Sequence, residues 1–267
     1  GWPSTGPSER SAARKMADLS ALPPIRYVNL DRDGVRRAAM EAEFARLGLH
    51  AERFPAVLWS ALAPEAQARY YSDALNRRQH HLPLVGGEKG CYASHLQLWR
   101  WLLDSPHECA VVLEDDVALE PDFAALCTAI AQLDEPWHMV KLIGREGLGR
   151  EEKLLGSQAL SGRYELVRYR RVPSLTAGYL LHREGARHLL QARLPFGRPI
   201  DVDLRHWWEC GADFRLLGVR PAAIRLADTS AESSINAPLK ALPWPQRWRK
   251  FVLKARYTLA NHRHRTP

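Results

Sequence analysis

Three consecutive carboxylates, Glu114, Asp115 and Asp116, follow a short aliphatic run at residues 109–113. A run this short and aliphatic predicts a buried parallel strand, and open α/β sheets bind ligands at the carboxyl ends of their strands. Carboxylates at positions 114 and 116 can direct oxygens toward one point, which suits Mn²⁺ or Mg²⁺ beside a diphosphate. The alternative is an exposed acidic turn in front of a helix.

A second acidic pair lies in "RPIDVDLRHWWECG", where Asp201 and Asp203 follow a proline. A positioned carboxylate can accept the proton of a hydroxyl group that attacks a substrate. The two residues are close enough in sequence that either could have this role. We take Asp201 as the first candidate for a general base and Asp203 as the second.

The segments around these residues alternate between strand-like and helix-like patterns. Helix periodicity is found at residues 35–47, which end before Gly48, and at residues 93–104, while strand patterns are found at 25–30, 109–113, 138–144 and 164–172. This alternation predicts an α/β fold, with an open, mostly parallel, twisted sheet and helices on both faces.

Length and composition limit the classes of protein that fit. The chain has 267 residues, of which 46% are hydrophobic, and can bury a substantial core. We expect a flexible leader at 1–21, one folded domain at 22–236 and a basic amphipathic tail at 237–267. No apolar run approaches the roughly 18 residues that span a bilayer, and the four cysteines form no CxxC pair. A cytoplasmic location is the simplest expectation.

The tail concentrates the positive charge of the chain, whose formal net charge is +8. No acidic residue follows Glu232, and Trp244, Trp248 and Phe251 alternate with Lys and Arg. This mixture suits a helix lying on an anionic membrane surface better than a groove that follows a phosphate backbone. We therefore expect a membrane partner and no nucleic acid; a solvated basic helix is the alternative.

Four motifs occur in an order that resembles glycosyltransferase family 25, which includes bacterial lipooligosaccharide transferases and relatives that glycosylate collagen hydroxylysine. They are "NLDRDGVR" from Asn29, "GEKGCYASH" from Gly87, "VVLEDDV" from Val111 and "TAGYLL" from Thr176. The resemblance covers residues 25–235. It implies a GT-A-like fold over the domain at 22–236, a nucleotide-sugar donor that is commonly UDP-galactose, and a metal site carried by "EDD".

The resemblance also suggests roles for individual residues. Asp116, together with Glu114, would bind the metal, and Asp115 would contact the ribose or the donor sugar. The remaining residues expected to bind the nucleotide sugar are Asn29, Arg32, Glu88, Ser94, His95, Glu114 and Gly178. Asn29 and Arg32 could instead form a turn with a surface charge, and His95 could be a buried core histidine. Gly178 could mark a strand bulge rather than a close approach to a sugar.

The expected function is an inverting, metal-dependent transfer of a hexose, most simply galactose from UDP-galactose. The acceptor would be a sugar hydroxyl of a lipopolysaccharide or lipooligosaccharide core, at the inner face of the bacterial inner membrane. Two alternatives stay open: a catalytically silent sugar-binding protein of the same fold, and a metal-dependent nucleotidyltransferase. The sequence contains no glycine-rich phosphate-binding loop that ends in lysine, which counts against a nucleotidyltransferase.

Overall fold

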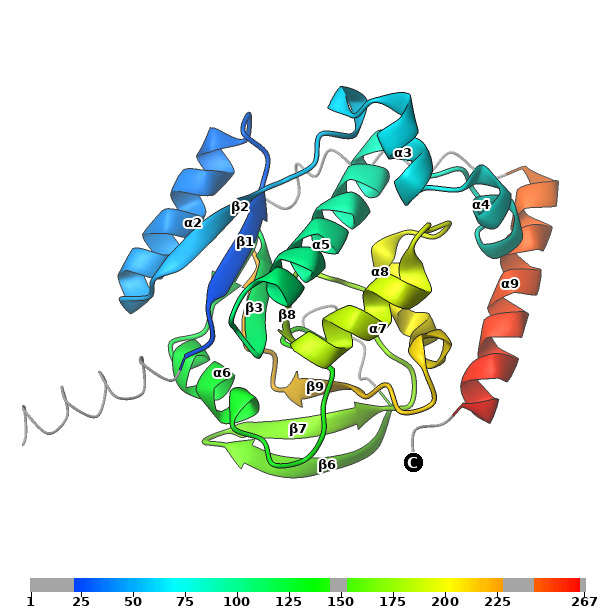
Figure 1. Cartoon of the computed structure of the whole chain (residues 1–267). Coiled ribbons are helices and arrows are strands. Elements are labelled where there is room, and N and C mark those ends of the chain that lie inside the picture. Colours follow the sequence, from blue (N-terminus) through cyan, green and yellow to red (C-terminus); the bar gives the residue numbers. More distant parts are fainter. Residues whose placement is uncertain (1–21, 145–152, 228–242, 265–267) are drawn as a thin grey trace, which may run out of the picture.

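The computed structural model describes residues 22–144, 153–227 and 243–264 (Figure 1). The predicted leader at 1–21 lies outside the described residues, as do the first six residues of the predicted tail. The domain predicted at 22–236 is described over most of its length.

An eight-stranded sheet, in the order β2-β1-β3-β8-β5-β9-β7-β6, forms the centre of the fold. Its strands are β1 (Ile25–Asn29), β2 (Ala51–Pro55), β3 (Cys109–Glu114), β5 (Met139–Lys141), β6 (Leu154–Ser161), β7 (Tyr164–Tyr169), β8 (Gly178–His182) and β9 (Leu216–Arg220). Strand β1 is parallel to β2 and β3, and β5 is parallel to β9. The sheet is mixed, because β8 is antiparallel to both of its neighbours and β7 is antiparallel to β6 and β9.

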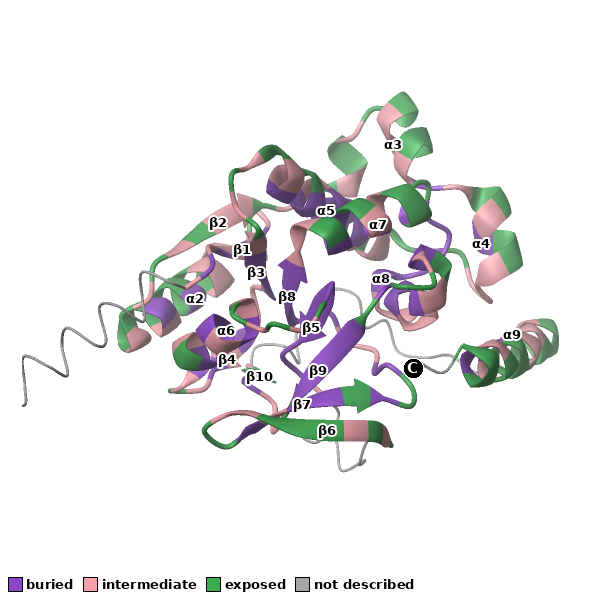
Figure 2. Ribbon diagram, turned by 60° about the horizontal axis from the view of Figure 1, so that its bottom comes forward, coloured by how far each residue is buried: buried purple, intermediate pink, exposed green. Residues whose placement is uncertain are grey.

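Side chains alternate across this sheet and build a core on each face. On β3, Val111 and Leu113 pack with helices α2 and α6, whereas Ala110 and Val112 pack with α5 and α7. Figure 2 shows that the central strands are buried. The helices are α2 (Gly34–Leu47), α3 (Pro64–Tyr70), α4 (Asp73–Gln79), α5 (Gly86–Asp104), α6 (Phe123–Ala131), α7 (Arg183–Arg193), α8 (Ile200–Asp203) and α9 (Trp244–Arg263). The expected α/β fold with helices on both faces is confirmed.

Helix α5 begins at Gly86, seven residues before the predicted start at residue 93. The side chain of Glu88 accepts a hydrogen bond of 2.9 Å from the backbone N–H of Val85, which caps the first turn. The glycine-rich start of the helix has no apolar periodicity, so the sequence pattern did not reveal its first turns. As a result, Ser94 and His95 lie in the middle of the helix, and the prediction that they form its N-terminus is wrong.

The basic tail contains a helix, α9, that packs against the rest of the protein. Tyr257 and Asn261 are buried, and Asn261 Nδ2 donates to the carbonyl of Arg170 at 2.8 Å. Arg249 Nε donates to the carbonyl of His80 at 2.8 Å. The other sides of α9 are largely exposed (Figure 2). None of the helices among the described residues has the length and apolar character needed to cross a membrane.

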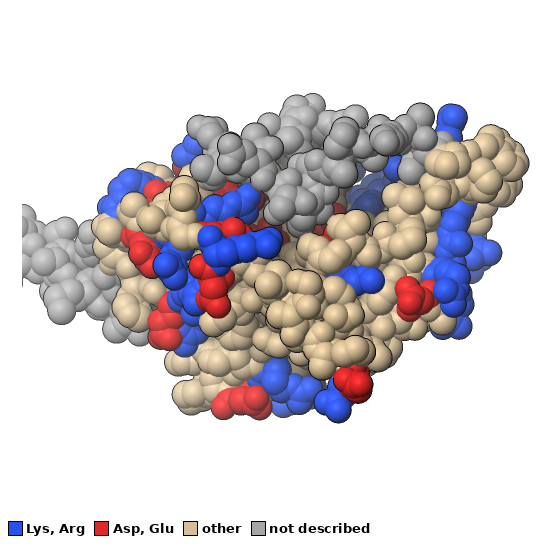
Figure 3. Space-filling view, turned by 90° about the horizontal axis from the view of Figure 1, so that it is seen from above, with Lys and Arg blue, Asp and Glu red and all other residues tan. Residues whose placement is uncertain are grey.

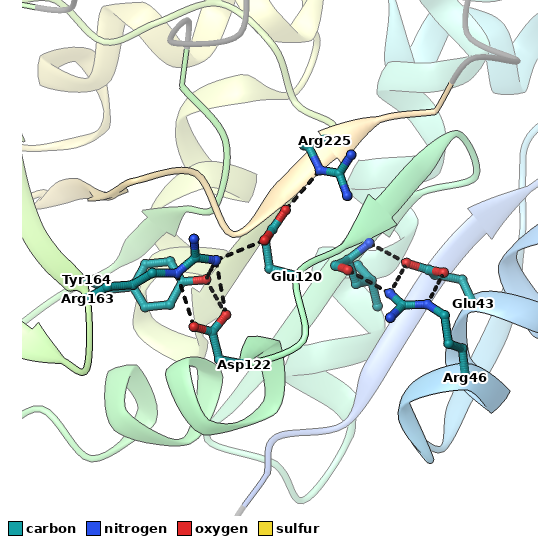
Figure 4. Close-up of polar contacts among 8 residues, drawn as sticks. Glu43, Arg46, Glu120, Asp122, Arg163, Tyr164 and Arg225 are labelled. Atoms are coloured by element: carbon teal, nitrogen blue, oxygen red, sulfur yellow. Dashed lines mark hydrogen bonds and ion pairs between the residues drawn. The ribbon is translucent and has the colours of Figure 1, made fainter.

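A polar cluster holds the segment that follows the acidic triplet (Figure 4). This segment contains β4 (Val117–Leu119), which pairs with β10 (Ile224–Leu226). Next to β4, Glu120 accepts hydrogen bonds from Arg163 at 2.9 Å and from Arg225 at 2.8 Å. The backbone N–H of Leu119 donates to Glu43 of α2 at 2.6 Å. Contacts to several elements therefore fix the chain on the C-terminal side of the triplet.

We predict that Gly90→Ala destabilises the fold by about 1–3 kcal/mol, because overpacking a rigid contact forces the backbone to move. A methyl group at Gly90 would collide with the carbonyl oxygen of Val57 and lie 3.5 Å from the backbone nitrogen of Trp59. Urea unfolding monitored by circular dichroism measures the change. Gly86→Ala, in the same helix with nothing within 4 Å, is the control and should cost nothing; equal stability of the two variants would contradict this packing argument.

Candidate active site

The candidate site lies where β1 and β3 end, at one edge of the sheet. Val28 is paired with Glu114, so Asn29 and the triplet lie side by side. Strand β8 runs the opposite way and begins there, with Gly178 opposite Leu113. Ligand atoms of Cys91 and Glu114 lie within 4.8 Å of each other. Burial first, and then the charges of Glu114 and Asp201, raise the pKa of the Cys91 thiol well above its ordinary value. Sequence motifs far apart in the chain therefore meet at this edge.

Asp115 is held tightly from the β1 side of the site. Its Oδ2 accepts a hydrogen bond from Asn29 Nδ2 at 2.7 Å, and its Oδ1 accepts one from Arg36 at 3.0 Å. Each carboxylate oxygen thus has a hydrogen-bond partner in the protein, and one of the two partners, Arg36, is a cation. Asp115 and Asn29 form a fixed support for the turn. A contact between Asp115 and the donor stays a prediction.

Asp116 is the least satisfied member of the triplet. Its Oδ1 is buried and has no hydrogen-bond partner among the described residues, and Arg36 lies 3.8 Å from its Oδ2. Burial, and next the negative charge of Glu114, raise its pKa to about 6. A buried carboxylate oxygen without a partner is unusual in native proteins. It is the atom in this site that is best placed to bind a cation.

Glu114 points toward a buried hydrogen-bond chain. Thr176 donates to its Oε1 at 2.8 Å, and His95 Nε2 lies 3.7 Å from the same oxygen. Tyr179 accepts from Trp99 at 2.8 Å and lies 2.7 Å from His95 Nδ1. If Tyr179 donates its single hydroxyl proton to His95 Nδ1, the hydrogen of the neutral imidazole is on Nε2. That nitrogen lies 3.7 Å from Glu114 and has no hydrogen-bond partner among the described residues. Burial alone would raise the pKa of Glu114, but His95 and its other partners lower it overall.

Several residues predicted to bind the donor have internal roles in the structure. Ser94 and His95 are 0% exposed, and Ser94 Oγ donates to the carbonyl of Gly90 at 2.7 Å while accepting from Val57 at 2.8 Å. A side chain at Gly178 would collide with Ile224, so that glycine serves packing. Arg32 is exposed beside Asp33, and it is Arg36 that reaches the triplet. For Ser94, burial and two satisfied hydrogen bonds exclude the predicted donor contact in this arrangement.

The two candidate bases have different surroundings. Asp203 is 2% exposed and bonds to three buried partners: Tyr92 at 2.5 Å, Arg198 at 2.6 Å and Arg193 at 3.2 Å. Both carboxylate oxygens of Asp203 already contact buried tyrosine or arginine side chains and are not free to meet a substrate hydroxyl, so the second candidate is withdrawn. Asp201 forms no ion pair within the described residues, and burial raises its pKa. A raised pKa suits proton abstraction near neutral pH.

Sequence reasoning missed two cations of the site. Arg36 was within a recognised motif, but nothing in its spacing showed that it reaches Asp115. Lys141 ends β5 and is 1% exposed, with its Nζ donating to the carbonyl of Pro173 at 2.6 Å. Its charge lowers the pKa values of both Glu114 and Asp201. The sequence feature that could have identified it is a lysine directly after a buried hydrophobic run, as in "HMVK". Burying an ammonium group is costly unless it has polar or charged partners.

The site residues fit a hard cation at Asp116. Its orphaned Oδ1 is an oxygen ligand of the type that Mn²⁺ and Mg²⁺ prefer. Ligand atoms of Cys91, His95 and Glu114 also lie within 4.8 Å of one another, but sulfur and nitrogen ligands suit Zn²⁺. Burial raises the pKa of the Cys91 thiol well above its ordinary value, so it stays protonated. The residues therefore fit a hard cation at Asp116, with Glu114 beside it in a supporting role.

The mixed α/β sheet with helices on both faces and an acidic site at the end of β3 is consistent with a GT-A-like glycosyltransferase fold. The sequence profile described as "Glycosyltransferase family 25 (LPS biosynthesis protein)" matches residues 23–204. The chain therefore belongs to glycosyltransferase family 25.

Similar proteins carry the same family name. A "Glycosyltransferase 25 family member" of Anopheles gambiae is 30% identical over 196 residues, which are 70% of this chain and 31% of that protein. The corresponding protein of Drosophila melanogaster is 30% identical over 188 residues, 68% of this chain and 30% of that protein. Human "Procollagen galactosyltransferase 2" is 34% identical over 125 residues, 45% of this chain and 19% of that protein. The chain thus spans about a third or less of the length of these relatives.

We predict that Asp116→Asn stabilises the metal-free protein at pH 7.5 by up to roughly 2 to 3 kcal/mol. The pKa of Asp116 in the folded state, about 6, lies above its ordinary value of 3.8, so its ionisation opposes folding at higher pH. The gain should fade as the pH falls through 6 toward 4. Thermal unfolding in EDTA across this pH range measures it.

Asp122→Asn is the control with the opposite sign. Burial raises the pKa of Asp122, but hydrogen bonds from Tyr164 and Arg163 outweigh it and lower the pKa overall. Neutralising Asp122 should therefore lower stability at pH 7.5. If Asp116→Asn also lowers stability at every pH, the Asp116 carboxylate is not the unsatisfied group described above.

Proposed function

We propose that this domain is a metal-dependent, inverting galactosyltransferase that uses UDP-galactose. Its acceptor is a sugar hydroxyl of a lipopolysaccharide or lipooligosaccharide core. Membership of family 25 supports glycosyl transfer, and the description of the family as LPS biosynthesis proteins supports the acceptor class. Relatives named procollagen galactosyltransferase support galactose as the sugar. The observation that carries this function is the buried Oδ1 of Asp116, just after β3, which has no hydrogen-bond partner among the described residues. Asp201, which forms no ion pair within the described residues and has a raised pKa, is the proposed base.

In this proposal Asp116 acts on the leaving group and Asp201 acts on the nucleophile. Asp116 would hold Mn²⁺ or Mg²⁺, and the bound ion would supply positive charge to offset the negative charge of the departing diphosphate. Asp115, fixed by Asn29 and Arg36, keeps the turn in place. Asp201 accepts the proton of the acceptor hydroxyl while the oxygen attacks the anomeric carbon from the opposite side.

A donor screen tests the function as a whole. UDP-, GDP- and CMP-sugars are compared for thermal stabilisation with and without Mn²⁺, because a ligand that binds only the native state raises its stability. UDP-galactose with Mn²⁺ should give the largest shift, and transfer should release UDP. Release of pyrophosphate would identify a nucleotidyltransferase instead. Donor binding with neither transfer nor hydrolysis would identify a silent sugar-binding protein.

We predict that Asp201→Asn binds UDP and Mn²⁺ nearly as the wild type does but transfers at least roughly a hundredfold more slowly. Loss of a positioned base lowers turnover by about 10² to 10⁴ and affects binding little. Calorimetric titration with UDP and a steady-state UDP-release assay separate the two effects. Unchanged turnover in this variant would place the base elsewhere, with Glu88 next to be tested.

Asp203→Asn is the matched comparison two residues away. Removing one partner of a buried ion-pair network costs roughly 3 kcal/mol or more, so this variant should lose stability first. If it folds normally yet is inactive while Asp201→Asn is active, the two assignments are exchanged.

The proposal places the enzyme at the inner face of a bacterial inner membrane, with α9 against anionic lipid. Trp244, Trp248 and Phe251 are 73%, 56% and 62% exposed. Neighbouring rings are stacked, with centroids 6.3 Å and 5.7 Å apart, so they form one aromatic row. Exposed aromatic rings beside Lys and Arg are typical of helices that lie in a membrane interface.

We predict that Trp244→Ser/Trp248→Ser weakens sedimentation with phosphatidylglycerol vesicles at least about tenfold, since each buried aromatic side chain contributes roughly 1.5 kcal/mol or more. Donor binding should stay unchanged. Leu259→Ser, on the same helix and 55% exposed, is the control. Wild-type binding should also fall as salt rises. Equal sedimentation of all three proteins would show that the aromatic row is not the membrane contact.

A further inference from the structure

A cavity of about 410 Å³ lies between α9 and the body of the protein, and we call it the basic pocket. It is lined by seven Lys or Arg side chains, from α4, α9 and the segments around β7 and α8, and by one carboxylate, Glu209. In Figure 3, Lys and Arg side chains gather at the end of the molecule that carries α4 and α9. The candidate active site uses none of these residues.

The positive charge of the basic pocket is not balanced within the described part of the chain. Glu209 already forms ion pairs with Arg198 and with Arg193, which lies outside the pocket. The other six cations make no ion pair with any described residue: Arg78, Arg171, Arg205, Lys250, Lys254 and Arg256. Like charges gathered in a cavity repel one another, and a bound anion would relieve that repulsion.

The walls of the basic pocket provide more than charge. Arg205 has a buried Nε without a hydrogen-bond partner among the described residues, and its guanidinium lies 4.6 Å from the centre of the Tyr257 ring. A guanidinium fixed in this way can bind phosphate through two parallel hydrogen bonds. Trp208, Tyr257 and Leu253 add apolar surface. The volume falls within the range of about 300–1,000 Å³ for small-molecule sites, which exceeds the needs of a phosphate ion.

The electrostatic surroundings agree with this geometry. Burial, followed by the charges of His81, Arg198 and Lys250, lowers the pKa of His80 to about 4. Burial and Arg198 lower the pKa of His206 to about 4 as well. Both imidazoles are therefore neutral at pH 7 and add no further repulsion.

The basic pocket adjoins the candidate active site through α8. Val202 lines the pocket, and the preceding residue, Asp201, is the proposed base. The basic pocket and the proposed base therefore share the short helix α8.

We propose that the basic pocket binds the phosphate of a phosphorylated saccharide that forms part of the acceptor; the link to the acceptor rests on the proposed function. Phosphate supplies two negative charges in the geometry that arginine matches, and the aromatic and aliphatic wall accommodates the sugar ring.

Calorimetric titration with glucose 6-phosphate in the presence of saturating UDP and Mn²⁺ tests the pocket directly. UDP occupies the other site, so its presence should not prevent binding. Lys250→Glu/Lys254→Glu should weaken binding at least about tenfold, since hydrogen bonds to charged groups are the strong ones. Arg247→Glu/Arg263→Glu, two exposed positions of α9 outside the pocket, is the control with the same change in net charge and should bind as the wild type does.

Three results would overturn the inference. The first is no binding of glucose 6-phosphate, or equal loss in both double variants. The second is an affinity for inorganic phosphate equal to that for glucose 6-phosphate, which would show that the saccharide contributes nothing to binding. The third is binding only to phosphatidylglycerol vesicles, which identifies a lipid headgroup. If UDP binds and sugar phosphate does not, this inference fails and the proposed function stands. If the pocket binds sugar phosphate but no glycosyl transfer occurs, the proposed function fails instead.

Discussion

The carboxylates at the end of β3 repel one another, and the surrounding residues of the site must offset this repulsion. Glu114, Asp115, Asp116 and Asp201 lie close enough to raise the pKa of one buried thiol together. The protein balances them unequally: Asp115 has an arginine and an amide, and Glu114 has a threonine, a histidine and a distant lysine. Asp116 and Asp201 keep raised pKa values. These two carboxylates, whose negative charge the protein offsets least, are the ones proposed to bind the cation and to accept the proton of the substrate hydroxyl.

The mixed topology of the sheet makes this unequal balance possible. A purely parallel sheet would bring only carboxyl ends of strands to the site. Here β8 runs antiparallel between β3 and β5, so the segment leading into it places Thr176 against Glu114, while β5 brings Lys141 to the same edge. Tyr179, one residue into β8, then connects the strand to the His95 chain in α5. The reversed strand and the segment before it thus position the partners of Glu114, while Asn29 and Arg36 hold Asp115 from the other side.

The sequence predicted those features that depend on local pattern. The strand before the triplet, the position of the triplet at its end and the presence of helices on both faces all followed from periodicity and residue type. The roles of Ser94 and His95 did not, because glycines concealed two turns of α5 and so hid the direction of both side chains. The different roles of Asp201 and Asp203 could not be predicted either. Their surroundings depend on arginines from α7 and from the loop before α8, which no short pattern reveals.

That same ion-pair network explains how a helix of four residues can separate two regions of opposite charge. Asp203 is fixed by Arg193 and Arg198, and the arginines are fixed in turn by Glu209. Buried pairs of this kind contribute little net stability but specify one arrangement. With Asp203 anchored, the preceding residues of α8 are oriented as well: Asp201 stands near the carboxylates, and Val202 lines the basic pocket. The position of the proposed base and the shape of the pocket are therefore set by one set of contacts, so a change in that network should disturb both together.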